Sequence, residues 1–434
     1  MLYHNTNKAK ILFMKIRTPY YYKDFKCIAG DCTDTCCAGW DVDVDEKSYR
    51  YYKSVKGEFG KRLKSVMVPE KEGGCTFTLT EDKRCPFLND KNLCDLYIAL
   101  GEEHLCETCD EFPRFINEYG NVREIGIAPS CITAGELMFA DRQKMHFDEF
   151  EDGKPIDMYN DINAFLYMQL CNARKLAFDI IDYEELSVDE VCIILLEFAR
   201  QIQKHMDNER DDLIASVVKR FKDKEYCCNV VSSCREKLKK DTDRQREAGR
   251  AGVGSRYIDA VSKFFDSFKG MEVINKDWLI YVDKERAFER NIKKLNKSDK
   301  SDKTGNEVFN YTLADEMYRN ALKGFKKYYK DKEYQFRQLL DYYVYRYFLD
   351  SVYDINLVLK IKNAVVGYLI VRQLDMVCWH ENGNTEYDEH VDIAHLYSRQ
   401  FEHSYTNFEV YSDYFMRKRC YSIKVLEGLL LYED

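Results

Sequence analysis

The stretch CIAGDCTDTCCAGW, residues Cys27–Trp40, decides how this chain is understood, because it places four cysteines within a few positions. A second run, Cys85–Arg114, holds four more, and Cys131 follows shortly after it. Thiolates a few residues apart can converge on one ion or cluster without closing a long loop. Both stretches also carry proline or glycine beside the cysteines, which fixes the turns. The sequence therefore predicts a loop-rich, cysteine-liganded metal or cluster module.

The cysteine count favours metal binding over disulfides. The 434-residue chain has 17 cysteines, and we find no signal-peptide pattern, so we expect a cytoplasmic protein with reduced thiols. Zinc and a [4Fe–4S] cluster each take four cysteines, and the candidates exceed one site. Adjacent Cys36 and Cys37 seldom serve the same metal atom, so either one is idle or there are two centres. The candidate ligands are Cys27, Cys32, Cys36, Cys37, Cys85, Cys94, Cys106, Cys109 and Cys131.

Proline marks the predicted domain boundary, since all six prolines lie within the first 155 residues. We expect a mainly α protein: an N-terminal extension (1–14), the cysteine-rich module (15–150) and a helical region (151–434). Gln335–Asp350 and Leu313–Phe325 repeat apolar residues at helical spacing. Val191–Ile202 and Leu357–Val371 are mostly apolar and fit buried helices, although a strand is also compatible with the second.

Two polar segments of the helical region are predicted to be exposed loops. Residues 235–256 are rich in Lys and Arg, and residues 293–306 read KKLNKSDKSDKTGN. Such segments bury too little apolar surface to offset the entropy of ordering. Gly249-x2-Gly252-x-Gly254 follows no apolar strand, so we interpret it as a flexible loop and expect no conventional doubly wound methyltransferase domain.

Charge and hydropathy limit the partners. The net charge of −9 argues against nucleic-acid binding, and no apolar run is long enough to cross a membrane. A negative surface would tolerate a basic or lysine-bearing protein substrate.

The cysteine motifs resemble one known family. The Cys27–Trp40 run, CPFL at 85–88, the Cys106–Arg114 segment and PSC at 129–131 are similar to the flagellin lysine-N-methylase (FliB-like) family, with its CxxCxxCC zinc- or iron-chelating domain. The resemblance covers residues 15–139 and weakly His395–Asn407. It implies an S-adenosylmethionine (SAM)-dependent protein-lysine N-methyltransferase that acts on flagellin in the cytoplasm and carries a [4Fe–4S] cluster. Zinc is the alternative metal, and a zinc-stapled, non-enzymatic adaptor or a redox protein is the alternative function.

Methylation requires the lone pair of a lysine amine, whose ordinary pKa is about 10.4, so the site must take up a proton. Tyr97, Glu103 and His104 lie among the cysteines and are the predicted catalytic residues. For SAM or substrate contacts the sequence offers Arg399, Glu402 and His403. Solvated charges and packing would explain each of these residues as well.

Overall fold

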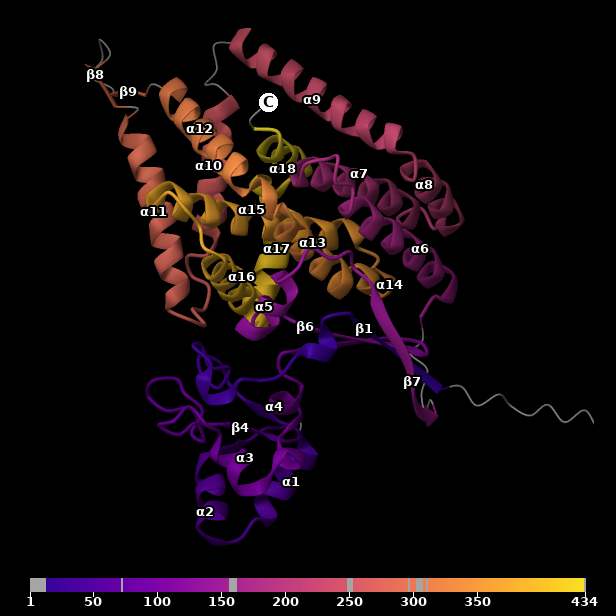
Figure 1. Ribbon diagram of the computed structural model, residues 1–434, viewed down its shortest axis with the longest axis vertical. Helices are drawn as coiled ribbons and strands as arrows, with labels where there is room; N and C mark the ends of the chain where they lie inside the picture. The colour runs from indigo at the N-terminus through magenta and orange to yellow at the C-terminus, as the bar shows by residue number, and fades with distance from the viewer. Residues whose placement is uncertain are drawn as a thin grey trace, which may run out of the picture.

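A computed structural model describes residues 13–71, 73–155, 162–247, 253–295, 297–301, 307–309 and 311–432. A large helical body occupies one end of the molecule, and the cysteine-bearing segments form a smaller module at the other (Figure 1). A β-sheet lies where the two parts meet. The predicted class, mainly α with a loop-rich cysteine module, is confirmed.

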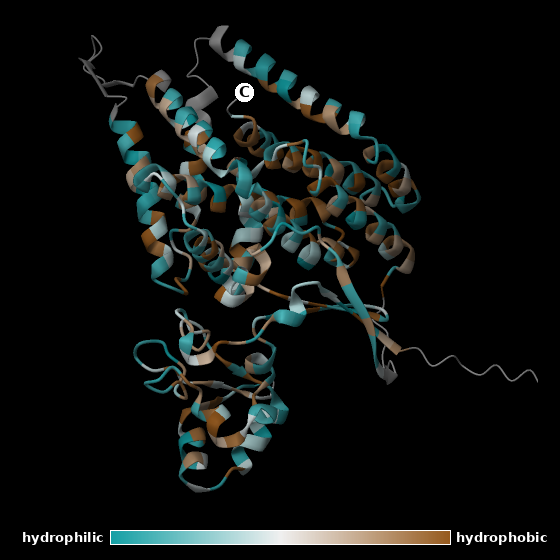
Figure 2. Ribbon diagram, viewed as in Figure 1, coloured by the Kyte–Doolittle hydropathy of each residue, from teal (hydrophilic) through white to brown (hydrophobic). Residues whose placement is uncertain are grey.

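The helical body surrounds one central helix, α15 (Leu357–Asn382), which contacts α7, α11, α12, α13 and α16. Apolar residues face the interior of this bundle and polar residues cover its outside (Figure 2). Asn356 caps the start of α15 through the Leu359 N–H, and Gly383 ends it with left-handed backbone. The other long helices are α6 (Ala164–Ile181), α7 (Val188–Met206), α8 (Ile214–Phe221), α9 (Lys224–Glu247), α10 (Val253–Ser267), α11 (Asp277–Leu295), α12 (Tyr311–Tyr329), α13 (Glu333–Tyr347), α16 (Tyr387–Glu402), α17 (Tyr405–Arg417) and α18 (Ile423–Leu430).

The four helical segments predicted from apolar spacing or apolar content are helical in the structure. They correspond to α7, α12, α13 and α15, and the ambiguous segment 357–371 is helical throughout. Its apolar residues face neighbouring helices on every side, which explains why it shows no single apolar stripe.

The sheet at the junction has the strand order β5-β6-β1-β7. β1 (Phe13–Pro19) runs parallel to β6 (Val122–Ile127), whereas β5 (Arg114–Tyr119) and β7 (Phe147–Pro155) pair antiparallel with their neighbours. The Tyr345 hydroxyl on α13 donates a hydrogen bond to the Arg17 carbonyl oxygen at 2.8 Å, which ties the sheet to the helical body.

The cysteine module has its own small hydrophobic core, which includes Tyr52, Leu63, Phe77 and Phe87. Tyr119 and other residues up to Phe139 join the core of the helical body instead. Phe115 of β5 and Phe147 of β7 pack on Tyr345 of α13, so the sheet shares the core of the helical body, and the boundary at residue 150 stays a prediction. The module contains α1 (Glu46–Ser54), α2 (Gly57–Val66), α3 (Asp95–Leu100), α4 (Glu107–Glu111), β2 (Asp43–Val44), β3 (Met67–Pro69) and β4 (Cys75–Phe77).

The prediction of two exposed loops, at 235–256 and 293–306, is partly wrong. Residues 235–247 continue α9, because their Lys, Arg and Glu residues favour helix and pair along it, as Lys240 does with Glu236. In the second segment α11 extends to Leu295, and β8 (Lys297–Ser301) pairs with β9 (Glu307–Phe309). Gly254 lies in α10, while Gly249 and Gly252 fall outside the described residues. Across the described part of the chain, no helix is both long and apolar enough to span a membrane.

A buried carboxyl on α11 gives stability a specific pH dependence. Burial, and then the nearby Glu289 carboxylate, raise the pKa of Glu285 from its ordinary 4.5 to about 8. Between these values the folded chain holds a proton that the unfolded chain has lost. The free energy of unfolding should therefore fall as pH rises from 4.5 to 8, by up to about 1.4 kcal/mol per pH unit. Glu285→Gln should remove this fall in urea unfolding measured from pH 5 to pH 8.5; an unchanged slope in the variant would contradict the assignment.

Candidate metal centre

Backbone pairing joins the two cysteine-rich stretches. The Cys85 N–H donates to the Cys37 carbonyl oxygen at 2.7 Å, and the Gly39 N–H donates to the Lys83 carbonyl oxygen at 2.8 Å. Gly39 has a φ of +89°, and a Cβ there would lie 2.3 Å from the Ile274 carbonyl oxygen. Glycine at this position therefore permits both the turn and the close approach of the loop to the helical body.

Six cysteines line one cavity of about 60 Å³ inside the module: Cys36, Cys37, Cys85, Cys94, Cys106 and Cys109. Its other walls are largely apolar and include Trp40, Phe77, Phe87 and Phe112. Burial raises the pKa of the Cys85 thiol to about 12. A metal that binds in this cavity would have to displace thiol protons.

Two pairs of thiols in this cavity influence each other directly. The sulfur atoms of Cys36 and Cys37 lie 4.0 Å apart. A hydrogen bond from Cys36 lowers the pKa of Cys37, and one from Cys109 lowers the pKa of Cys106. Cys106 stands at the N-cap position of α4, without a capping hydrogen bond from its side chain. Within each pair the two thiols are therefore coupled, and one of them has a lowered pKa.

Three of the nine predicted ligands lie outside this cavity. Cys27 is exposed, Cys32 is half-buried with its thiol 3.1 Å from the Asp34 carbonyl oxygen, and Cys131 stands at the N-cap position of α5 (Ile132–Phe139). Burial, and then the neighbouring Cys32 and Cys27, raise the pKa of the Cys131 thiol to about 11.

Among the described residues, no group of three or more His, Cys, Asp and Glu side chains is arranged to hold a metal ion. A tetrahedral zinc site with bonds of about 2.3 Å needs four sulfurs only about 3.8 Å apart. Six of the nine predicted ligands thus surround one cavity without closing on a single point.

Helix α16 fastens the first cysteine loop to the helical body. One oxygen of the Asp34 carboxylate lies 2.8 Å from His395 Nε2, 2.7 Å from Arg399 Nη1 and 2.6 Å from Asn275 Nδ2. His395 Nδ1 lies 3.2 Å from the Pro129 carbonyl oxygen. The imidazole of His395 therefore lies between the first cysteine loop and the segment that precedes Cys131. We call Asp34, His395 and Arg399 the α16 clasp.

The three residues predicted to bind SAM have different surroundings. Arg399 donates to the carbonyl oxygens of Thr35 and Ala38, so it contacts the cysteine loop directly. His403 Nε2 lies 2.6 Å from the Ser130 hydroxyl, next to Cys131, and burial lowers the pKa of His403 to about 3.

Glu402, the third of these residues, has its partners within the helical body. Its buried carboxylate accepts a hydrogen bond from the Tyr342 hydroxyl at 2.9 Å and pairs with Arg346 at 3.2 Å, and Tyr347 and Ser398 also donate to it. These contacts occupy it within the helical body, so packing explains Glu402 better than a cofactor contact does.

The predicted catalytic residues do not come together. Tyr97 is exposed on α3, and the His104 ring stacks on Tyr51 with centroids 4.1 Å apart. Glu103 lines an open acidic hollow of about 740 Å³ on the outside of the module, together with Asp45, Glu102, Glu107, Asp110 and Glu111. None of the three predicted residues lines the cysteine cavity, and their catalytic roles stay predictions.

Asp34 and His395 are site residues that sequence reasoning missed. Asp34 lies within the cysteine run, and His395, Arg399 and His403 follow one another at four-residue spacing, which places them on one face of a helix. The four-residue spacing can be seen in the sequence. The contact of His395 and Arg399 with Asp34 cannot, because Asp34 lies far away in the chain.

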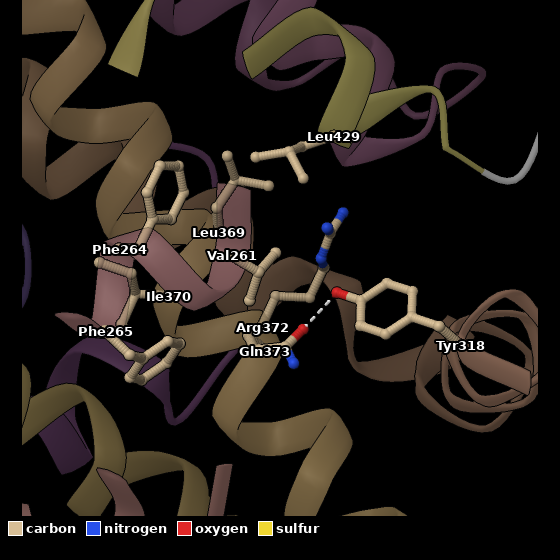
Figure 3. Close-up of a pocket in the computed structure, with 9 residues that line it drawn as sticks. All are labelled: Val261, Phe264, Phe265, Tyr318, Leu369, Ile370, Arg372, Gln373 and Leu429. Carbon is tan, nitrogen blue, oxygen red and sulfur yellow. Dashed lines mark hydrogen bonds between the residues drawn. The ribbon is translucent and has the colours of Figure 1, made fainter. Parts of the chain in front are cut away.

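A further cavity lies within the helical body, between α10, α12, α15 and α18 (Figure 3). Tyr318 donates a hydrogen bond to Gln373 Oε1 at its edge, at 2.6 Å. The volume of about 10 Å³ suits a water molecule at most, so a cofactor the size of SAM does not fit.

Fold and site together define a helical protein that carries a module of clustered cysteines, fastened to the helical body by helix α16. The family model described as FliB lysine N-methylase C-terminal domain matches residues 174–428, which is more than half of the chain. The chain belongs to this family. The matched residues form the helical body, where the sequence resemblance is weaker, and they include the clasp residues His395 and Arg399.

Curated relatives agree with this family. The flagellar biosynthetic protein FliU of Salmonella muenchen is 23% identical over 139 residues, which cover 31% of this chain and 82% of FliU. Lysine-N-methylases of Salmonella choleraesuis (strain SC-B67) and Salmonella typhimurium (strain LT2) are also 23% identical over 139 residues. The match spans about a third of the length of these two enzymes, 35% in each case. No solved structure matches the chain.

Proposed function

We propose that the chain is a SAM-dependent protein-lysine N-methyltransferase that acts on flagellin in the cytoplasm and carries a cysteine-bound [4Fe–4S] cluster. Membership of the lysine N-methylase family supports the reaction class, and the likeness to the flagellar biosynthetic protein FliU supports a flagellar substrate. The observation that carries the proposal is the cavity lined by six thiols. A cysteine-bound metal cluster is the function that best accounts for so many thiols around one cavity.

The donor set fits an iron–sulfur cluster better than zinc. Six thiols surround the cavity, yet no three ligands within the described residues close on a single point as a zinc ion requires. A cluster has several iron atoms, each with its own thiolate, so its ligands lie farther apart. The apolar walls around Trp40 and Phe112 would keep water from the sulfur atoms.

The residues of the chain would divide the remaining tasks. When bound, the cluster would supply an iron without a protein ligand, which can hold SAM. The clasp residue Arg399 fixes the backbone of the loop that carries Cys36 and Cys37. A substrate lysine must lose a proton before it attacks the methyl group, and Glu103 in the acidic hollow is the predicted residue best placed to attract the protonated amine.

The proposal predicts that iron and methyl transfer depend on the cavity thiols. Protein purified without oxygen should be brown, contain iron and sulfide, and transfer labelled methyl from SAM to flagellin. Cys36→Ala and Cys109→Ala should each lose the colour and lower methyl transfer at least about 100-fold, because their thiolates would be ligands. The matched control is Cys228→Ser, which changes an exposed cysteine on α9 and should keep both properties.

A colourless protein with stoichiometric zinc and no methyl transfer would contradict the proposal and favour the zinc-stapled adaptor. Iron-loaded protein that methylates a different protein would overturn the flagellin assignment alone.

A further inference from the structure

Strand β5 forms one edge of the sheet at the junction. Among the described strands it pairs with β6 on one side and with none on the other. The Ala128 N–H donates to the Pro113 carbonyl oxygen at 3.0 Å, so Pro113 and every second residue after it bond to β6. The backbone N–H and carbonyl groups of Arg114, Ile116 and Glu118 therefore point away from the sheet.

The surroundings of β5 agree with this direction. The Tyr353 hydroxyl of α14 (Ser351–Asp354) donates a hydrogen bond to the Glu118 carbonyl oxygen from outside the sheet. Within the described part of the chain, the N–H and carbonyl oxygen of Ile116 bond to no other residue, and the Ile116 side chain is 39% exposed. A strand edge with unpaired backbone groups can accept another extended segment as a further strand.

The helical body holds the inner face of β5 in place. Asn117 Nδ2 donates to the Arg346 carbonyl oxygen of α13 at 2.7 Å, and the Tyr119 hydroxyl donates to the Asp350 carboxylate at 2.8 Å. Because the edge is already fixed in an extended conformation, a segment that pairs with it pays little to order this side of the contact.

The open edge begins beside the candidate metal centre. Phe112, two residues before β5, lines the cysteine cavity, and Asp110 and Glu111 line the acidic hollow. Burial, and then the nearby Glu107 and Asp110 carboxylates, raise the pKa of Glu111, which shows how closely the negative charges gather there. Such a hollow attracts positively charged side chains. The opposite edge strand, β7, adjoins neither the cavity nor the hollow.

We propose that the free edge of β5 binds an extended, lysine-bearing segment of the protein substrate, which adds to the four-stranded sheet as a fifth strand. The segment continues past Arg114 into the acidic hollow, where its lysines meet the carboxylates. Alternate side chains of a strand face the same side, so lysines at every second position can enter the hollow together. The identity of the occupant rests on the proposed function, whereas the open edge rests on the register of β5.

Ile116→Pro tests the edge in the full-length protein. Proline removes the outward N–H but leaves the bonds to β6 intact, because Ile116 takes part in none of them. The probe is a fluorescent ten-residue peptide of alternating lysine and threonine. Its Kd should rise at least about 10-fold in Ile116→Pro and stay within about 3-fold in the control Ile116→Thr, which keeps the N–H. Both variants should keep the urea midpoint of the unmodified chain.

Two further measurements test the pairing and the charge. The same peptide with every backbone nitrogen methylated should bind the unmodified chain at least about 10-fold more weakly, because it cannot donate to a strand edge. Asp110→Asn/Glu111→Gln should raise the Kd about 3- to 10-fold and make binding less sensitive to salt. The control is Glu58→Gln/Glu81→Gln, which neutralises two exposed carboxylates outside the hollow.

The outcomes separate this inference from the proposed function. Equal affinity of Ile116→Pro, or of the methylated peptide, would overturn docking on β5 even if the chain methylates flagellin. Binding that depends on the Asp110 and Glu111 charges alone would overturn it as well. Binding that Ile116→Pro removes at an unchanged urea midpoint, in a chain that methylates no flagellin, would support the edge and overturn the proposed function.

Discussion

Asp34→Ala is expected to lower methyl transfer about 10- to 100-fold, the usual effect of removing a residue that orients the ligands of a metal site. Asp34 is the shared acceptor of the α16 clasp, with His395, Arg399 and Asn275 all within 2.8 Å of one oxygen. Burial opposes ionisation here, yet the hydrogen bond from His395 and the Arg399 charge hold the pKa of Asp34 below its ordinary value. The variant would leave buried Arg399 without its carboxylate partner.

Iron content measured beside the methyl-transfer rate will show how the Asp34 variant acts. A displaced cysteine loop should lose iron together with activity, and added SAM should not restore either. Asp41→Ala offers a matched control, because Asp41 lies on the same loop but is exposed. Equal losses in both variants would mean that the clasp has no special role, and full activity in Asp34→Ala would contradict it directly.

The sequence was sufficient for the helices of the body because their apolar residues recur at helical spacing. It also placed the cysteines together, since short spacings limit where the thiols can go. The 235–256 segment was mispredicted because composition alone does not separate a solvated helix from a loop. Its first half is polar but rich in strong helix formers, so it forms the last turns of α9.

The site was harder to predict because its supporting contacts join distant parts of the chain. Asp34 and His395 are 361 residues apart, and no local pattern pairs them. Glu402 carries a charge within the C-terminal motif, which made it a cofactor candidate, yet tyrosines and Arg346 of α13 surround it. The Tyr97, Glu103 and His104 prediction relied on closeness in sequence to the cysteines, whereas the structure turns these side chains outward from the cavity.

Glu124→Gln is expected to lower the free energy of unfolding by about 3–5 kcal/mol, because it leaves buried positive charge without its partner. Glu124 on β6 is fully buried, and its carboxylate pairs with Arg174 of α6 and, at 2.8 Å, with Arg17 of β1. This cluster joins the sheet to the helical body, so the variant should also loosen the junction from which the cysteine module extends. Urea unfolding followed by circular dichroism will measure the change.

Glu149→Gln is the matched control for this prediction. Glu149 pairs with the same Arg17 at 2.7 Å, but its side chain is 54% exposed, so the loss should be at most about 1 kcal/mol. Glu149→Gln removes one exposed carboxylate from Arg17, whereas Glu124→Gln removes the buried carboxylate that Arg17 and Arg174 share, so the contrast measures the cost of leaving Arg174 unpaired in the core. Losses of similar size would mean that water reaches Glu124 and that the ion pairs do not fix the sheet on the helical body. A large loss confined to Glu124→Gln, with iron content also reduced, would show that the cysteine module depends on this junction for its own stability.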